Sequence, residues 1–217
     1  EDGTLNIWRD DVLAVIAHAQ VGPLILVGSS MGGWLMLLVA EALGAQVMAL
    51  VGIAAAPDFT DWDFNDADRA TMAANGRIER PSDYGYDPMV ITRAFWQSGQ
   101  DNLRLNGAIG IDCPVRLIHG QCDPDVPWQT SLSLAARLRS SDVQTILVKD
   151  GDHRLSRDAD IALLIDSVAG CRRVPDPPAR TMPFMAWKLP LRPARRAGPG
   201  CRRAPPARAA ARCRRRP

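Results

Sequence analysis

The chain has few of the residues that most often hold metals or form cross-links. It contains three histidines and five cysteines in 217 residues, and Cys113 and Cys122 are the only cysteines before residue 171. Their spacing matches neither a disulfide framework nor a Cys/His zinc site. The chain also lacks the G-K-[ST] of a phosphate-binding loop and the G-x-G-x-x-G of a dinucleotide site. We therefore expect no metal and no other cofactor.

Long apolar runs are missing as well. No stretch reaches the ~18 apolar residues of a membrane-spanning helix, so we expect no membrane span. No signal peptide is visible, and we expect a cytoplasmic location, although a signal that preceded Glu1 would lie outside this sequence.

The small net charge of +2 conceals two segments of opposite charge. Residues 1–170 hold 12 basic and 23 acidic residues, whereas residues 171–217 hold 14 basic residues and one acidic residue. The second segment is mostly Arg, Pro, Ala and Gly, and it also contains Cys171, Cys201 and Cys213. It lacks apolar periodicity and cannot bury enough surface to offset its ordering entropy, so we expect a disordered tail.

Two interpretations of this basic tail stay open. GC-rich DNA read out of frame encodes such a composition, and we favour this frameshift because a good helix pattern at residues 161–168 stops abruptly. The alternative is a basic arm that binds nucleic acid or an anionic membrane.

The body of the chain has the pattern of an α/β domain. We expect four strands, at residues 24–29, 47–54, 115–119 and 143–148. We expect helices at residues 4–20, 31–44, 127–139 and 158–169. The strands are apolar throughout rather than alternating, which is typical of a parallel sheet covered by helices on both faces.

The junction of the first strand and its helix carries the most specific motif. The run L-I-L-V ends in G-x-S-x-G at residues 28–32, and a helix-forming stretch follows at once. Such a turn holds Ser30 at a strained apex. We expect that any side chain at position 28 or 32 would collide where the strand and the helix pack closely. It presents the Ser30 hydroxyl beside the backbone N–H of Met31, which can stabilise an oxyanion. The motif predicts a nucleophilic serine; a solvated serine in a Gly/Ser-rich turn is the alternative.

A nucleophilic serine needs a base and an orienting carboxylate. His18 lies in an amphipathic helical stretch, so we expect it on a helix surface, and we expect His119, which ends a strand, to be structural. His153 follows the strand at residues 143–148 in a polar turn, where a base belongs in an α/β sheet. The loop at residues 119–127 supplies the carboxylate, which gives the chain order Ser, Asp, His.

Other side chains near these loops have plainer interpretations. Cys122 is an alternative nucleophile, but the sequence shows no second base for it. Trp34 and Trp128 lie close to the predicted loops, and we expect them to be packing residues.

Three segments together resemble the catalytic loops of the α/β-hydrolase superfamily: G-S-S-M-G-G-W, H-G-x-x-D-x-x-V-P-W and G-D-H-R. They are similar to one branch, which contains mitochondrial acyl-glucuronide esterases and palmitoyl-protein thioesterases with their bacterial serine esterase relatives. The resemblance runs from about residue 3 to residue 170. It implies Ser30 as nucleophile, Asp123 rather than Asp125 as acid, His153 as base, and the Met31 backbone as one oxyanion donor.

The resemblance also implies an α/β-hydrolase fold and the hydrolysis of small-molecule carboxylic esters or thioesters through an acyl-enzyme. Alternatives are a catalytically impaired α/β-hydrolase fragment, an acyltransferase, haloperoxidase or lyase on the same fold, a non-catalytic binding module, and a basic-tailed nucleic-acid or membrane adaptor. The family has eight strands, so we expect residues 1–170 to be the C-terminal two-thirds of the domain. The second oxyanion donor would then precede Glu1, and this chain alone would be a poor catalyst.

A polar insert at residues 57–111 interrupts the predicted sheet, with helices expected at residues 66–75 and 88–97. It is either a small cap with an apolar acyl pocket or a surface excursion anchored by its aromatic side chains. Those aromatics are Phe59, Trp62, Tyr84, Tyr86, Phe95 and Trp96. We expect its acidic residues to be solvated and to cap its helix; they are Asp58, Asp61, Asp63, Asp66 and Asp68.

Overall fold

The computed structural model describes residues 3–81 and 88–171. Its central sheet has the strand order β1-β2-β5-β6, and every neighbouring pair is parallel. The strands are β1 (Leu24–Ser29), β2 (Val47–Ile53), β5 (Val115–Gly120) and β6 (Val143–Val148). The predicted parallel sheet is confirmed, and each strand lies within one residue of its expected bounds.

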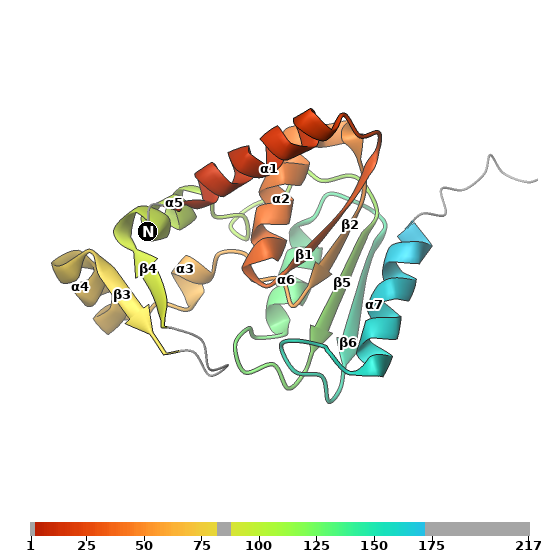
Figure 1. Ribbon diagram of the computed structural model, residues 1–217. Helices are drawn as coiled ribbons and strands as arrows, with labels where there is room; N and C mark the ends of the chain where they lie inside the picture. The colour runs from red at the N-terminus through yellow and green to blue at the C-terminus, as the bar shows by residue number, and fades with distance from the viewer. Residues whose placement is uncertain (1–2, 82–87, 172–217) are drawn as a thin grey trace, which may run out of the picture. The chain divides into compact units, whose positions relative to one another are not determined.

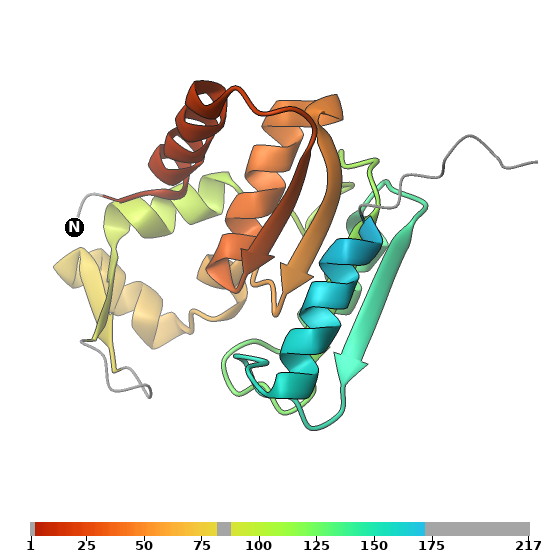
Figure 2. The same cartoon turned by 45° about the vertical axis from the view of Figure 1, so that its right-hand side comes forward.

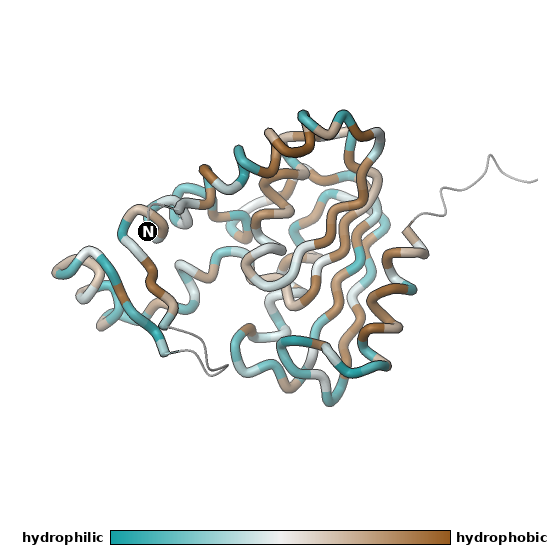
Figure 3. Tube along the Cα trace, viewed as in Figure 1, coloured by the Kyte–Doolittle hydropathy of each residue, from teal (hydrophilic) through white to brown (hydrophobic). Residues whose placement is uncertain are grey.

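Helices cover both faces of this sheet (Figures 1 and 2). On one face, α2 (Met31–Leu43) and α6 (Gln129–Arg137) pack against strand residues such as Leu50 and Leu117. On the other, α7 (Asp158–Cys171) packs against Val51 and Ile118. Successive strand residues point to opposite faces, so a sheet covered on both sides needs unbroken apolar strands. Brown predominates along the strands in Figure 3, and polar residues such as Arg116 in β5 and Gln144 in β6 interrupt it.

The helix α1 (Leu5–Ala19) is capped by Thr4, the residue before it. The Thr4 Oγ1 accepts a hydrogen bond from the Ile7 backbone N–H at 3.2 Å. Its main contacts are with α2 and with the insert. Of its residues only Leu5 is buried, while Ile7 and Val15 are 48% and 68% exposed. A short 3₁₀ turn, η1 (Gly44–Gln46), connects α2 to β2.

The insert forms a helical and hairpin unit beside α1 and α2 (Figure 1). Its elements are α3 (Phe59–Trp62), α4 (Asp66–Asn75), β3 (Arg77–Arg80), β4 (Met89–Thr92) and α5 (Arg93–Asp101). The prediction of α4 is confirmed. The helix predicted at residues 88–97 is wrong in its first half, which forms β4 and pairs antiparallel with β3. The β-branched run Val-Ile-Thr favours a strand, and Thr92 Oγ1 then caps α5 by accepting from the Phe95 N–H at 3.2 Å.

The acidic residues of the insert have two different roles. Asp61, Asp63 and Asp68 form ion pairs with arginines, and Asp68 completes a capping box at the start of α4. Asp58 does not match the expectation of a solvated carboxylate, because it is 3% exposed. It accepts hydrogen bonds from the backbone N–H groups of Arg104 and Leu105, at 2.7–2.9 Å. Burial raises its pKa, although these bonds oppose the rise.

Aromatic side chains join the insert to the helices of the body. Phe59 packs edge-on against Trp34, with ring centroids 5.8 Å apart, and Phe95 contacts both Phe59 and Trp8. The predictions for Tyr84, Tyr86 and the segment after Cys171 fall outside the described residues. Among the described helices, none is long and apolar enough to cross a membrane.

Candidate active site

Ser30 occupies the turn between β1 and α2, with φ 52° and ψ −126°. A positive φ costs a non-glycine residue about 1–3 kcal/mol and persists only where surrounding contacts enforce it. Here the Ser30 N–H donates to the Ile53 carbonyl at 2.9 Å, and the Ser30 carbonyl accepts from Gly33 and Ala56 at 2.9 and 3.0 Å. The backbone of the serine is therefore fixed from both sides.

Close packing of strand and helix explains two glycines of this turn. A Cβ on Gly28 would lie 2.4 Å from the Gly32 carbonyl oxygen, and a Cβ on Gly33 would lie 2.4 Å from the Cβ of Ala55. A Cβ on Gly32 would meet nothing within 4 Å. The prediction of a steric need at Gly28 is confirmed, but at Gly32 it is wrong, because that position faces open space and Gly33 makes the close approach.

Asp123 lies in the loop between β5 and α6, and its side chain is fully buried. Its Oδ1 accepts from the backbone N–H groups of Asp125 and Val126, at 2.8 and 2.9 Å. Its Oδ2 faces two imidazoles, His153 Nδ1 at 2.8 Å and His119 Nε2 at 3.1 Å. Both carboxylate oxygens thus have two hydrogen-bond partners, which fixes the orientation of the group.

The His153 loop, between β6 and α7, is held directly against the Asp123 loop. The Gln121 N–H donates to the Val148 carbonyl at 2.8 Å, and the Cys122 N–H donates to the Gly151 carbonyl at 2.9 Å. A Cβ on Gly120 would lie 2.2 Å from the Gly151 carbonyl oxygen, so this approach requires glycine. These backbone contacts fix the position of the His153 loop relative to the Asp123 loop.

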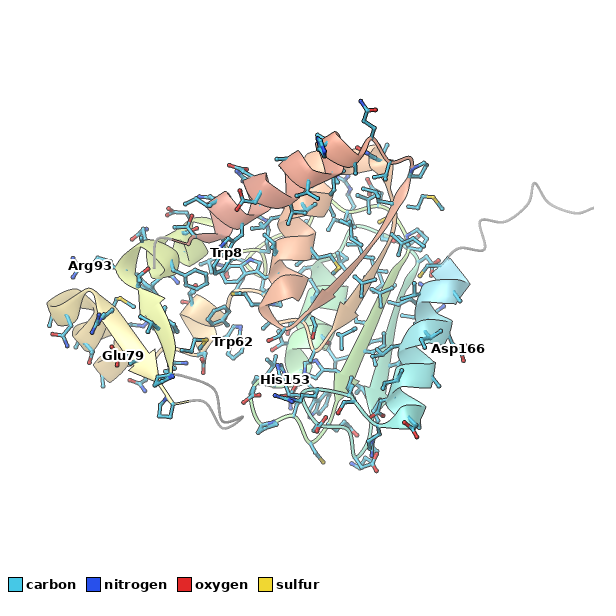
Figure 4. All side chains as sticks on the ribbon, viewed as in Figure 1. Trp8, Trp62, Glu79, Arg93, His153 and Asp166 are labelled. Atoms are coloured by element: carbon cyan, nitrogen blue, oxygen red, sulfur yellow. The ribbon has the colours of Figure 1, made fainter. Side chains whose placement is uncertain are left out.

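The structure brings the three predicted residues together at the carboxyl ends of the strands, where Figure 4 labels His153. His153 Nε2 lies 3.1 Å from Ser30 Oγ, and its Nδ1 lies 2.8 Å from Asp123 Oδ2. The His153 side chain is 14% exposed. A hydroxyl, an imidazole and a buried carboxylate in this order can transfer the hydroxyl proton to the imidazole while the oxygen attacks a carbonyl carbon.

Hydrogen bonds shift the pKa values of the two titratable members. Burial alone would raise the pKa of Asp123, but the bonds from His119, His153 and the two backbone N–H groups hold it well below its usual range. The bond to Asp123 raises the pKa of His153 above its ordinary 6.5, while burial opposes this change. The nearby carboxylates Asp125 and Asp152 raise it further. The carboxylate is thereby kept ionised and the imidazole made more basic.

Met31 is the first residue of α2, so its backbone N–H has no acceptor within the helix. The positive end of the helix dipole lies at the same point, beside the serine. An oxyanion formed next to Ser30 would find a donor and a favourable potential there.

The remaining predicted side chains are also placed. His18 is exposed on α1, as predicted. Trp34 is fully buried and donates from Nε1 to the Asn102 carbonyl at 3.1 Å, which confirms a packing role, and Trp128 is half-buried before α6. Cys122 is exposed, and its Sγ contacts the Lys149 carbonyl at 3.6 Å.

Among the described residues, one group of acids and histidines has ligand atoms that converge within 4.8 Å: Asp123, Asp125 and His153. Both ring nitrogens of His153 already have hydrogen-bond partners, Asp123 on one side and Ser30 on the other. A metal ion bound there would therefore have to displace one of these two hydrogen bonds.

A parallel sheet with helices on both faces and a strand–serine–helix turn defines the α/β-hydrolase class. Solved structures agree: a putative hydrolase from Agrobacterium vitis S4 has a TM-score of 0.74 at 42% identity, covering 78% of this chain and 69% of that one. The mouse α/β-hydrolase domain-containing protein 10 has a TM-score of 0.71 at 41% identity, covering 77% and 69%.

Within this class the chain belongs to the prolyl oligopeptidase family, whose sequence model matches residues 13–168. The human mitochondrial palmitoyl-protein thioesterase ABHD10 is 40% identical over 172 residues, which cover 77% of this chain and 56% of that protein. The chain therefore spans about half the length of the curated relatives it matches.

Proposed function

We propose that this chain carries the catalytic residues of a serine hydrolase that cleaves carboxylic esters or thioesters through an acyl-enzyme. The observation that carries the proposal is that His153 lies within hydrogen-bond distance of Ser30 Oγ through one ring nitrogen and of Asp123 through the other. The thioesterase name of its relatives, at about 40% identity, supports the same class of reaction.

The reaction follows from the roles of these groups. His153 Nε2 accepts the Ser30 proton as Oγ attacks the acyl carbonyl, and Asp123 stabilises the imidazolium that results. The Met31 N–H donates to the oxyanion of the tetrahedral intermediate. The imidazolium then protonates the leaving alcohol or thiol, and a water activated by the neutral His153 hydrolyses the acyl-enzyme.

A mostly apolar cavity of about 240 Å³, which reaches the site through Met31, supports an acyl substrate. Met31, adjacent to Ser30, lines it together with Trp8, Phe59, Ile91 and Phe95. This cavity is smaller than the ~300–1,000 Å³ of pockets for drug-sized ligands. We infer that it takes the apolar acyl group of the substrate, and that the insert supplies much of this pocket.

The test uses the full 217-residue chain with Ser30→Ala and, as a matched control, Ser29→Ala on the neighbouring residue of the same turn. A fluorophosphonate probe should label the wild type and Ser29→Ala but not Ser30→Ala. Turnover of p-nitrophenyl esters should fall about 10⁴-fold or more in Ser30→Ala, with the melting temperature unchanged.

Several outcomes would contradict the proposal. Labelling of another serine, or full turnover by Ser30→Ala, would remove Ser30 as the nucleophile. Loss of turnover on addition of EDTA would favour a metal at Asp123, Asp125 and His153. A series of acyl lengths and a chromogenic prolyl amide, run in parallel, would separate ester from peptide hydrolysis.

A further inference from the structure

His119 has more contacts at this site than its position at the end of a strand predicts. It is the fifth residue of β5, and its side chain is fully buried. Its Nδ1 lies 2.7 Å from Ser131 Oγ on α6. Its Nε2 lies 3.1 Å from Asp123 Oδ2 and 3.0 Å from the Val126 carbonyl oxygen.

The partners of the ring decide where its proton lies. A carbonyl oxygen and an ionised carboxylate can only accept hydrogen bonds. Nε2 faces both, so it must carry a hydrogen and donate. Nδ1 faces a hydroxyl, which can donate or accept. Nε2 is therefore the donor to Asp123 whether or not Nδ1 is also protonated.

This donor acts on the oxygen that His153 uses. Asp123 Oδ2 is shared by the two imidazoles, whereas Oδ1 is occupied by backbone N–H groups. A second donor on Oδ2 disperses the negative charge of that oxygen and limits how it can rotate. Both effects act on His153 through Asp123 Oδ2, the atom that its Nδ1 contacts.

We propose that His119 is a positioning residue for the reaction: its Nε2–H fixes Oδ2 of Asp123 toward His153 and moderates how strongly this carboxylate attracts the His153 proton. The inference rests on the proposed function. The other charged groups that act on His153 are the carboxylates of Asp125 and Asp152, which lie on loops. Substitution of His119 removes a donor from Asp123 itself.

The test follows the titration of His153 rather than activity alone. Because the chain has three histidines, single substitutions assign each ring in an NMR spectrum of the full chain. His119→Leu removes the donor, His119→Gln keeps an N–H donor near the position of Nε2, and His18→Gln is the control on the exposed helix.

In His119→Leu we expect the His153 titration midpoint to rise by about 0.5–1 pH unit, because an Oδ2 that lacks this donor attracts the proton more strongly. The acid limb of kcat/KM should move to higher pH by the same amount. The plateau kcat should fall about 10- to 100-fold at unchanged KM, since Asp123 is less well oriented. His119→Gln should restore the wild-type midpoint, and His18→Gln should not change it.

A midpoint and an acid limb that coincide with the wild type in His119→Leu would overturn the proposal, even if kcat fell. If His119→Leu does not fold, His119→Met, which also lacks an N–H donor, is titrated in its place. A wild-type midpoint in His119→Met would then overturn the proposal. Since the titration is read without turnover, it tests this proposal separately from the proposed function.

Discussion

Replacement of Asp123 by asparagine changes one atom and removes an acceptor on which two imidazoles depend. In the native site Oδ1 accepts from two backbone N–H groups, and Oδ2 accepts from His119 and His153. Asparagine has one acceptor oxygen. With that oxygen kept at Oδ1, its NH₂ group faces two ring nitrogens that both donate in the native protein.

The expected loss can be worked out from this conflict. His153 must give up its Nδ1 proton or rotate away from position 123. In the tautomer with the proton on Nε2, it cannot accept the proton of Ser30. In serine hydrolases with this arrangement the same substitution lowers kcat about 10⁴-fold, which corresponds to about 5.4 kcal/mol of transition-state stabilisation. The stability cost should be smaller, about 1–3 kcal/mol, because the His119 Nε2–H keeps its bond to the Val126 carbonyl.

The assay compares Asp123→Asn with Asp125→Asn in the same loop. We measure kcat and KM on a p-nitrophenyl ester at the pH of the wild-type plateau, with thermal melts to show that each variant is folded. Asp125→Asn keeps its backbone N–H to Asp123 Oδ1, so its kcat should stay within about threefold of the wild type. Equal losses in the two variants, or a larger loss in Asp125→Asn, would refute the assignment of Asp123.

Two further predictions concern the same loops. The raised pKa of His153 means that its neutral, proton-accepting form appears only as the pH rises through that value, so the acid limb of kcat/KM should lie above the ordinary 6.5; a limb at or below 6.5 would contradict this. Gly120→Ala should lower kcat about 100-fold and lower the melting temperature, because its Cβ would overlap the Gly151 carbonyl and displace the His153 loop. Gly22→Ala, whose Cβ would meet nothing within 4 Å, is the matched control, and equal effects of the two substitutions would refute the steric argument.

Much of the fold could be predicted because its signals are local. The apolar runs and their flanking turns place β1 and β6 at the bounds that the structure shows. The helix of the insert at Asp66–Asn75 was equally clear, since capping residues and a following glycine bound it on both sides. Prediction failed at β4, where the β-branched run Val-Ile-Thr favours a strand locally and pairing with β3 across the insert stabilises it.

The buried Asp58 shows a second limit. In the sequence it is one of five closely spaced aspartates, and nothing distinguishes it from the solvated ones. Its two backbone donors belong to Arg104 and Leu105, more than forty positions away. Only the return of the chain past α5 decides that this carboxylate is buried and the others are not.

The sequence by itself determined which loops carry Ser30, Asp123 and His153, because each loop follows an apolar strand and parallel strands present their carboxyl ends at one edge of the sheet. The tertiary structure decided how these side chains meet. It placed His119 on the same oxygen of Asp123 that His153 uses, and it required glycine at position 33 rather than 32. Those outcomes depend on distances of a few ångströms between separate segments, and such distances are set by the packing of the whole sheet rather than by any local pattern.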